Sequence, residues 1–310
     1  MKKKYLALCG GIGGAKLAYG LSKKLSSDEL IFIVNTGDDF IHFDLNISPD
    51  IDTLIYTLTN MNDHTRGWGI KDETWEFMRI LDRIKEDTWF QLGDKDLMTH
   101  IKRSFLIKEG GLFSEVITKI AVDFNVNYSI FPMSEIPVST ILETDIGILS
   151  FQEYFVKHKC HPAIKEINFR NSINAKVPDS LLQKMQENYF SGIIICPSNP
   201  YLSIDPILSV KDIRDFLINR KCPAIAVSPI IKNRAIKGPT VKIMEELDLQ
   251  VSIDTILDHY KDMIDILLVD HEDKLSFSGR ENIQIEFDEI LMTDTKTKIT
   301  LAEACLNLLN

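Results

Sequence analysis

Residues 7–21 read ALCGGIGGAKLAYGL, and this stretch decides how the chain begins to fold. The apolar run 5–9 predicts a buried strand, and the periodic small and apolar residues of 15–25 predict a helix. Between the two stand Gly10, Gly11, Gly13 and Gly14. Glycine lets a backbone approach a phosphate closely, and a helix N-terminus offers unpaired N–H groups in a positive potential. We therefore predict an anion-binding turn for a nucleotide phosphate, with Lys16 as an added cation.

Two widespread glycine motifs do not fit this turn. The dinucleotide fingerprint G-x-G-x-x-G begins correctly at Gly11 and Gly13, but Lys16 stands where its third glycine belongs. The phosphate loop of nucleoside-triphosphate enzymes requires G-x-x-x-x-G-K-[ST], and Leu17 follows Lys16 where a hydroxyl side chain is needed. The alternative explanation is a strand-to-helix turn whose glycines only permit tight packing.

Composition limits the class of protein. The chain has 310 residues, enough for one large domain or two smaller ones, and its 45% hydrophobic and 26% charged residues are typical of a globular protein. A net charge of −10 argues against general binding to nucleic acid or to an acidic membrane surface. The start MKKKYLALCGG predicts a first strand and not a signal peptide, and no apolar run is long enough to span a membrane. Five cysteines without a C-x-x-C pair predict reduced thiols in the cytoplasm.

Further strand-like runs alternate with helical patterns. The predicted strands after the first are 30–35, 193–196, 224–228, 266–270 and 289–292. A helix is predicted over 48–60, with Ser48 as its N-cap and Pro49 at its first position. Near-continuous apolar strands that alternate with helices are typical of a parallel sheet covered on both faces. We predict the α/β class, with a doubly wound, mostly parallel, Rossmann-like sheet.

The middle of the chain breaks this alternation. Residues 74–124 have helical spacing, and Asp94 is a candidate cap for a helix that ends near residue 107. A small β-rich segment follows, at 129–133, 138–143 and 163–170. We predict a Rossmann-like nucleotide-binding core formed by 1–60 and 126–310, with 61–125 as a helical insertion over the active-site cleft.

Polar turns follow several predicted strands, at the sheet edge where parallel folds bind ligands. These turns are NTGDDF at 35–40, PSNP at 197–200 and KGPT at 237–240. The nearby acidic residues are Asp38, Asp39, Asp44, Asp50 and Asp52. A carboxylate beside a phosphate is tolerated when it binds a metal, accepts a hydroxyl proton or contacts a sugar. For Asp50, stabilisation of a helix N-terminus is the alternative role.

Two other groups of residues are weaker candidates. The sequence HKCH at 158–161 gathers metal-binding side chains, but its spacing does not match a structural zinc site. Trp68, Trp75 and Trp89 are interpreted mainly as core residues, with stacking of one or two on a flat aromatic ligand as the alternative.

In combination, these segments resemble the 2-phospho-L-lactate transferase family, which builds the deazaflavin coenzyme F-420. The resemblance runs nearly end to end, through GGIGGAKLAYGL, VNTGDDF, ISPDIDTLIYTLT, GWGIKDETWEF, LGDKDL, PMSEIPVST, SFQEYFVK, ICPSNP, AVSPII and KGPTVKIMEEL. It implies a doubly wound fold and a Mg²⁺-dependent transferase. The implied reaction moves a 2-phospho-L-lactyl or phosphoenolpyruvyl group from its guanosine-diphosphate-activated form to the ribityl hydroxyl of the deazaflavin alcohol Fo, and releases GMP.

The resemblance also implies roles for individual residues. The guanosine diphosphate part would be bound by Gly11, Gly13, Gly14, Lys16, Ser198, Asn199, Lys237 and Gly238. Asp50 and Lys95 would contact the deazaflavin. Lys95 stands where the family more often has arginine, so a point charge replaces a bidentate contact, and HFDLNISPD at 42–50 lacks the glycine usual in that segment. Asp38 and Asp50 are the catalytic candidates, and Asp38 and Asp39 are the candidate ligands of Mg²⁺.

Two other functions stay open at this point. Nucleotide-sugar-binding metabolic regulators of a related family share the glycine-rich start, but carry a DDGGSSGR-like run where this chain has GDDFIHFD. An NAD(P)-dependent oxidoreductase would share the fold, but the third fingerprint glycine is missing. The transferase is favoured, with small-molecule substrates, no nucleic-acid or membrane partner, and a homo-oligomeric state. The activated acid is left open among lactate, enolpyruvate and glycerate.

Overall fold

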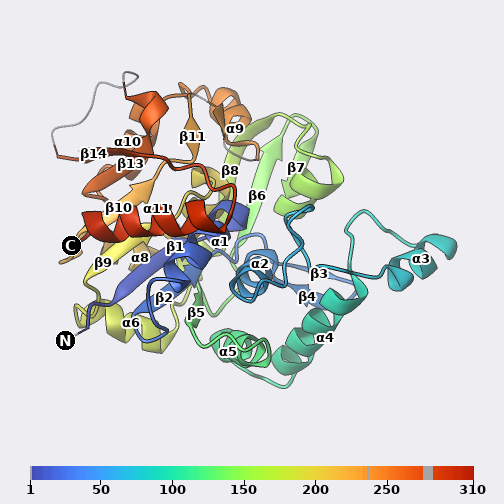
Figure 1. Ribbon diagram of the computed structural model, residues 1–310. Helices are drawn as coiled ribbons and strands as arrows, with labels where there is room; N and C mark the ends of the chain where they lie inside the picture. The colour runs from blue at the N-terminus through green and yellow to red at the C-terminus, as the bar shows by residue number, and fades with distance from the viewer. Residues whose placement is uncertain (1, 233, 236–237, 275–281) are drawn as a thin grey trace.

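The protein, studied as a computed structural model, is built around a parallel β-sheet (Figure 1). The structure describes residues 2–232, 234–235, 238–274 and 282–310. Within these residues the sheet has seven strands: β1 (Tyr5–Cys9), β2 (Leu30–Val34), β5 (Ser129–Pro132), β9 (Gly192–Ile195), β10 (Ala224–Val227), β13 (Ile266–Asp270) and β14 (Gln284–Asp288).

The order of these strands reverses at the middle of the sheet. It runs β14-β13-β10-β9-β1-β2-β5, and every neighbouring pair is parallel. The chain therefore moves outward from β1 to β5, returns to β9 beside β1, and then moves outward in the other direction. This is the doubly wound topology predicted from the sequence, and the reversal between β1 and β9 creates a crevice at the carboxyl ends of the strands.

Helices cover both faces of the sheet, as Figure 1 shows. One face carries α1 (Gly11–Ser22), α2 (Pro49–Leu58), α5 (Phe113–Asp123) and α11 (Thr295–Leu308). The other carries α6 (Asp179–Gln186), α7 (Asp205–Leu208), α8 (Lys211–Ile218), α9 (Thr240–Glu246), α10 (Ile253–Tyr260) and the π-helix η3 (Pro200–Ile204). No helix among the described residues has the length and apolar character needed to cross a membrane.

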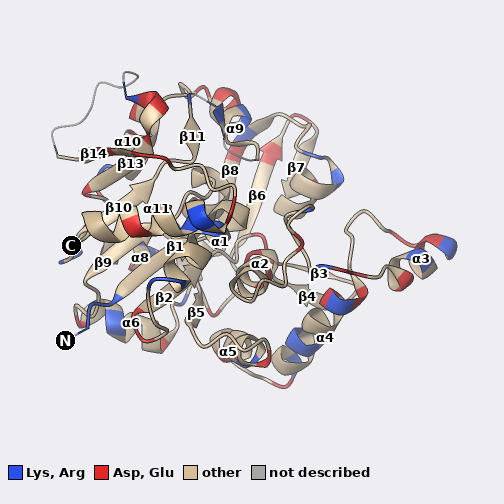
Figure 2. Cartoon of the chain, viewed as in Figure 1, with Lys and Arg blue, Asp and Glu red and all other residues tan. Residues whose placement is uncertain are grey.

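The central strand β1 joins the two hydrophobic cores. Its five residues are all buried, and alternate side chains point to opposite faces of the sheet. Leu6 and Leu8 enter one core, whereas Tyr5, Ala7 and Cys9 enter the other. A strand that is buried on both faces has apolar residues at every position, so it appears in the sequence as an uninterrupted apolar segment. This is why the position of β1 was predictable. Charged side chains gather instead on outer helices such as α9 and on the right-hand part of the molecule (Figure 2).

Smaller elements surround the carboxyl edge of the sheet. The antiparallel ones are the hairpin β3 (Phe40–His42) and β4 (Leu45–Ile47), the sheet of β6 (Ser139–Thr144), β7 (Gly147–Ser150) and β8 (Ile164–Arg170), and the pair β11 (Ile230–Ile231) and β12 (Arg234–Ala235). The helical ones are α3 (Glu76–Arg83), α4 (Asp94–Lys108), η1 (Glu153–Lys157), η2 (Ser172–Asn174) and η4 (His271–Asp273). Figure 1 shows α3 and α4 extending away from the sheet.

Several boundaries differ from the sequence-based prediction. The strand predicted at 129–133 is not part of the small sheet, because β5 pairs with β2 in the central one. The strand predicted at 289–292 is wrong, because β14 ends at Asp288 and pairs with β13 through its five residues. The helix predicted over 15–25 begins at Gly11, inside the glycine turn.

The segment 61–125 has two parts with different packing. Its helix α5 shares a core with α1 and contacts β5, so this helix covers the sheet. Its helix α3 packs instead in a separate small cluster around Met78, Leu81 and Leu92. The boundaries 61–125 stay a prediction, and the site described below takes residues from this segment.

Two acidic side chains cap α3 and α4 reciprocally. Asp94 accepts hydrogen bonds from the backbone N–H groups of Glu76 and Phe77, at 3.0 Å each, and so caps α3. Glu73 accepts from the N–H groups of Lys95 and Asp96, at 2.8 Å each, and so caps α4. The prediction that Asp94 caps α4 is therefore wrong, because Glu73 accepts the hydrogen bonds from the first N–H groups of that helix. Each acid satisfies orphan donors of the other helix and favours its N-terminal dipole.

We predict that Asp94→Ala loosens α3 and leaves the central sheet intact. Loss of an N-terminal cap costs about 0.5–2 kcal/mol of local stability. Hydrogen exchange followed by mass spectrometry should show faster exchange over α3, while exchange in β1 and β2 stays as in the wild type. Asp94→Asn retains an acceptor oxygen and serves as the matched control. Unchanged exchange in α3 of the alanine variant would contradict the capping role.

Candidate active site

A cavity of about 390 Å³ lies at the carboxyl edge of the central sheet. Its walls come from the residues that follow β1, β2, β9 and β10, from α2, from η1 and from the segment 61–125. Ligands of open parallel sheets bind at this edge, where the strand order reverses. The predicted clustering of polar turns at one edge is therefore confirmed.

The glycine turn forms the floor of the cavity. Gly11 has a φ of 59°, which favours glycine, and α1 begins there without any side-chain cap. A Cβ atom on Gly13 would lie 2.3 Å from the carbonyl oxygen of Pro197, so tight packing also requires a glycine at this position. Gly11 and Gly13 line the cavity, whereas Gly14 is buried behind it. The packing explanation and the anion-binding explanation therefore both fit this turn.

The turn after β9 lies beside the glycine turn. Ser198 accepts a hydrogen bond from the backbone N–H of Gly10 at 3.2 Å. Asn199 uses Oδ1 to cap η3, but its Nδ2 atom is buried and has no hydrogen-bond partner among the described residues. Both side chains line the cavity. An amide donor without a partner in this position can serve an anionic ligand.

The predicted basic residues differ in placement. Lys16 lines the cavity, and its ammonium donates to the carbonyl oxygen of Met292 at 2.8 Å. Gly238 also lines the cavity, and Lys237 lies outside the described residues. Lys95 is not a lining residue: its ammonium donates to the backbone carbonyls of Lys71 and Asp72. The structure therefore brings Lys16 and Gly238 to the site and directs Lys95 elsewhere.

Two buried carboxylates face the cavity beside the glycine turn. The amide of Asn35 donates to Oδ1 of Asp38 at 3.0 Å and to Oδ2 of Asp50 at 2.9 Å, which places one donor between two acids. Burial raises the pKa of Asp50 to about 6, against hydrogen bonds from Asn35 and the Gly11 backbone that lower it. Burial, followed by the charge of Asp50, raises the pKa of Asp38 well above its ordinary range.

The side chain of Asp39 does not point into the cavity as that of Asp38 does. Its carboxylate accepts a hydrogen bond from the hydroxyl of Ser48 at 2.7 Å and does not line the cavity. Ser48 occupies the N-cap position of α2 as predicted, but its hydroxyl does not cap the helix because it is engaged with Asp39. The Oδ1 atom of Asp39 is buried and has no hydrogen-bond partner among the described residues. Of Asp38, Asp39 and Asp50, the two acids that line the cavity are therefore Asp38 and Asp50.

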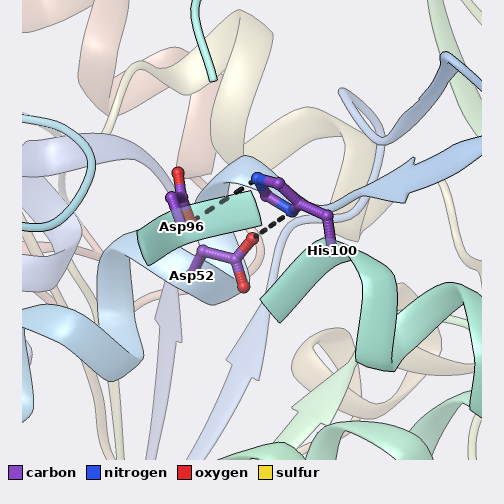
Figure 3. Close-up of side chains that lie close together, drawn as sticks. All are labelled: Asp52, Asp96 and His100. Carbon is purple, nitrogen blue, oxygen red and sulfur yellow. Dashed lines mark ion pairs between the residues drawn. The ribbon is translucent and has the colours of Figure 1, made fainter. Parts of the chain in front are cut away.

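A second polar cluster on the same cavity was not predicted from the sequence. Asp52 and Tyr56 come from α2, and Asp96 and His100 come from α4 (Figure 3). The fully buried Arg103 pairs with Asp52. The signal available in the sequence was the spacing of four residues within each pair, which puts both members on one face of a helix.

Aromatic side chains form part of the cavity wall. Phe151 and Phe155 have nearly parallel rings, with centroids 5.4 Å apart and planes at 11°. Trp68 also lines the cavity and is 41% exposed, which supports the alternative that a tryptophan contacts a flat ligand. Trp75 and Trp89 are not lining residues and pack against other aromatic rings. Within the described chain, the HKCH segment does not contribute to any group of three metal-binding side chains.

Comparisons with known proteins identify the family of this chain. A family model described as "2-phospho-L-lactate transferase CofD" matches residues 6–304. A 2-phospho-L-lactate transferase from Methanosarcina mazei is 33% identical over 296 residues, which cover 95% of this chain and 96% of the relative. Proteins of the same name from Methanosarcina acetivorans and Methanocaldococcus jannaschii are 34% and 33% identical, over 98% and 86% of both chains respectively.

The chain belongs to the 2-phospho-L-lactate transferase CofD family. The resemblance read from the sequence is thereby confirmed, and because the CofD family consists of transferases, the chain belongs to a family of enzymes. A solved structure from Bacillus halodurans, of a UPF0052 family member, is similar with a TM-score of 0.64 and 16% identity, over 99% of each chain. This second similarity concerns the fold.

We predict that Asp50 makes stability depend on pH in the absence of divalent cations. With a folded-state pKa of about 6 against an ordinary 3.8, folded protein keeps a proton that the unfolded chain has already lost. Stability therefore falls as the pH rises through the window from about 4 to about 6. Asp50→Asn does not have this loss. The difference in free energy of unfolding between the variant and the wild type should therefore shift by roughly 1–3 kcal/mol in favour of the variant as the pH rises from about 4 to about 6. The free energy of unfolding is measured with urea at each pH. If it changed with pH in the same way for the wild type and for Asp50→Asn, the raised pKa of Asp50 would be contradicted.

Proposed function

We propose that this chain transfers a 2-phospho-L-lactyl or phosphoenolpyruvyl group from a guanosine-diphosphate-activated donor to the ribityl hydroxyl of Fo, with release of GMP. The observation that carries the proposal is one cavity that joins an uncapped helix N-terminus, two buried acids and an aromatic end. Family membership supports phospholactate transfer as the reaction. A cytoplasmic location and a homo-oligomeric state stay predictions.

The end of the cavity at the glycine turn suits the diphosphate. The N–H of Gly11 donates to Asp50, and the N–H groups that follow it in the first turn of α1 have no intrahelical partner and carry the positive end of the helix dipole. Lys16 and the unpartnered Nδ2 of Asn199 add donors on neighbouring walls. Donors held in place by a helix and two turns can neutralise phosphate charge with little rearrangement, which is how phosphoryl transfer is accelerated.

The aromatic end suits the deazaflavin ring. Phe151, Phe155 and Trp68 line the cavity with flat apolar surface, on which a tricyclic ring can stack. Phe151 and Phe155 flank the start of η1, a π-helix, and such helices are frequent at functional sites. A ligand that stacks here and extends a polyhydroxylated chain inward would bring its terminal hydroxyl toward Asp50.

The acid pair fits a divalent cation such as Mg²⁺. Asp38 and Asp50 are buried carboxylates that share one neutral donor, and burial raises the pKa of each. Hard oxygen ligands of this kind are those that Mg²⁺ prefers. Asp38 would hold it from the cavity wall, with the charge of Asp50 beside it, in place of the predicted pair Asp38 and Asp39, because Asp39 does not line the cavity. When bound, Mg²⁺ supplies charge neutralisation at the transferred phosphoryl group.

The residues support an in-line displacement. The hydroxyl oxygen of Fo forms a bond to the phosphorus that carries the acid, and the bond from that phosphorus to the oxygen bridging it to GMP breaks. GMP leaves with the bridging oxygen, and the hydroxyl proton passes to a base. Asp50 suits this role because its pKa of about 6 is close to the working pH of a general base. Asn35 orients Asp50 through its hydrogen bond.

The test is incubation of the protein with Fo, Mg²⁺ and lactyl-diphosphoguanosine, with GMP measured by chromatography and the product by mass spectrometry. Parallel reactions with the enolpyruvyl and glyceryl donors identify the acid. The expected result is GMP release that requires Fo. Binding of a nucleotide without GMP release from any donor would instead indicate a regulatory protein of this fold.

We predict that Lys16→Ala weakens GDP binding by roughly 1–3 kcal/mol, the range of a hydrogen bond to a charged group. Isothermal titration calorimetry measures the affinity, and thermal unfolding checks that loss of the Met292 contact leaves the fold intact. Lys95→Ala removes a lysine that does not line the cavity and should leave GDP affinity unchanged. Equal GDP affinity of Lys16→Ala and the wild type would leave Lys16 with a packing role only.

We predict that Asp50→Asn lowers turnover roughly 100-fold or more, because general bases contribute about that much. Asparagine keeps the size of the side chain but cannot accept the hydroxyl proton. The affinity for GDP, measured by calorimetry, should stay as in the wild type because Asp50 serves the acceptor. A variant that releases GMP at the wild-type rate would refute this role.

A further inference from the structure

The second polar cluster carries two carboxylates and one guanidinium. Asp52 and Asp96 both line the cavity and are buried, at 4% and 8% exposure. Arg103 is completely buried and is already paired with Asp52. Because that guanidinium balances only one of the two acids, the charge of Asp96 must be stabilised by other donors or by a ligand.

Hydrogen bonds determine the tautomer of His100. Nη1 of Arg103 lies 3.2 Å from Nδ1 of His100, and because a guanidinium can only donate, Nδ1 must be the acceptor. Assigned in this way, the neutral ring carries its proton on Nε2, which lies 3.5 Å from Oδ1 of Asp96. Nδ1 therefore has no proton to offer to Oδ2 of Asp52, 3.6 Å away (Figure 3).

Two carboxylate oxygens on this wall accept no hydrogen bond from the described residues. Oδ2 of Asp52 is buried, and a buried acceptor without a donor costs free energy. Asp96 is held through Oδ1, to which the hydroxyl of Tyr56 donates at 2.6 Å, and within the described residues no hydrogen bond reaches its Oδ2. Because Asp52 and Asp96 both line the cavity, these oxygens can accept from a hydrogen-bond donor there.

Asp96 differs in charge state from the acids beside the glycine turn. Burial acts to raise the pKa of Asp96, but the hydrogen bonds from His100 and Tyr56 and the charge of Arg103 outweigh it, and the pKa is lowered. The pKa of Asp38 and that of Asp50 are raised instead. Burial also raises the pKa of Asp52, so among these four acids Asp96 is the carboxylate that stays ionised.

We infer that Asp96, with Asp52 beside it, makes the acceptor end of the cavity selective for a neutral, hydroxyl-bearing molecule and unfavourable for its phosphate ester. This inference rests on the proposed function, because it assigns the residues that bind the polyol chain of the acceptor. Hydroxyl groups donate to carboxylate oxygens, whereas a phosphate would place a like charge beside an ionised carboxylate. Asp96 is thus a specificity residue, distinct from the acid that takes the hydroxyl proton.

The test uses two flavins that share a ribityl chain. Riboflavin is neutral and FMN is its phosphate ester, and both are titrated by fluorescence with saturating GDP present to occupy the glycine turn. The wild type should bind riboflavin at least about tenfold more tightly than FMN, the factor that corresponds to one charge-assisted contact. In Asp96→Asn riboflavin should bind about tenfold more weakly, and the preference should fall to within about threefold.

Asp94→Asn is the matched control, because it makes the same charge change two residues away, outside the cavity. It should keep the wild-type preference. Turnover with Fo gives a second readout: Asp96→Asn should raise KM for Fo about tenfold while kcat changes little, which a purely structural role would not produce.

The outcomes separate this inference from the proposed function. A wild type that releases GMP from lactyl-diphosphoguanosine but binds both flavins equally, or binds neither, overturns the inference and leaves the function standing. An Asp96→Asn variant that keeps the preference for riboflavin also overturns it. Absence of GMP release by the wild type overturns the proposed function. If Asp96→Asn fails to fold, the comparison of the two flavins on the wild type still decides.

Discussion

The site depends on the side-chain amide of Asn35, which holds Asp38 and Asp50 together at the ends of β1 and β2. Two like charges buried side by side repel each other and lose hydration, so they persist only where other contacts of the fold hold them in place. Here the parallel strands place Asn35 beside Gly10, and α2 begins with Asp50 in its first turn. The absence of a Cβ on Gly10 matters for the same reason, because that atom would lie 2.7 Å from Oδ2 of Asp50.

This arrangement gives the cavity three electrostatically distinct regions. The N-terminus of α1 is positive, the Asp38 and Asp50 pair is negative but able to take up a proton or a cation, and Asp96 is a fixed negative charge. We propose that these regions direct a donor that carries a diphosphate and an acceptor that carries only hydroxyls to different parts of the cavity. The chemistry of group transfer requires such an order, because the attacking hydroxyl must meet the phosphorus in one orientation.

The sequence predicted the fold well because the central strands are apolar on both faces and lie between glycine and proline turns. It also located Asp38, Asp50 and Asn199, since these follow strand ends directly. The deazaflavin contact of Lys95 stays a prediction, and the position of this lysine within LGDKDL does not reveal that its ammonium donates to the carbonyl of Asp72. The role of Asp96 and His100 was missed because it depends on α4 packing near α2, a contact between distant segments that no local pattern records.

The most direct measurement of the central claim is a crystal structure of the protein with GDP, Fo and Mg²⁺. We expect the diphosphate to bind at the N-terminus of α1 and the deazaflavin ring to stack against Phe151 and Trp68. The ribityl chain should then pass Asp96 toward Asp50. A diphosphate bound away from the glycine turn, or an Fo molecule outside this cavity, would contradict it.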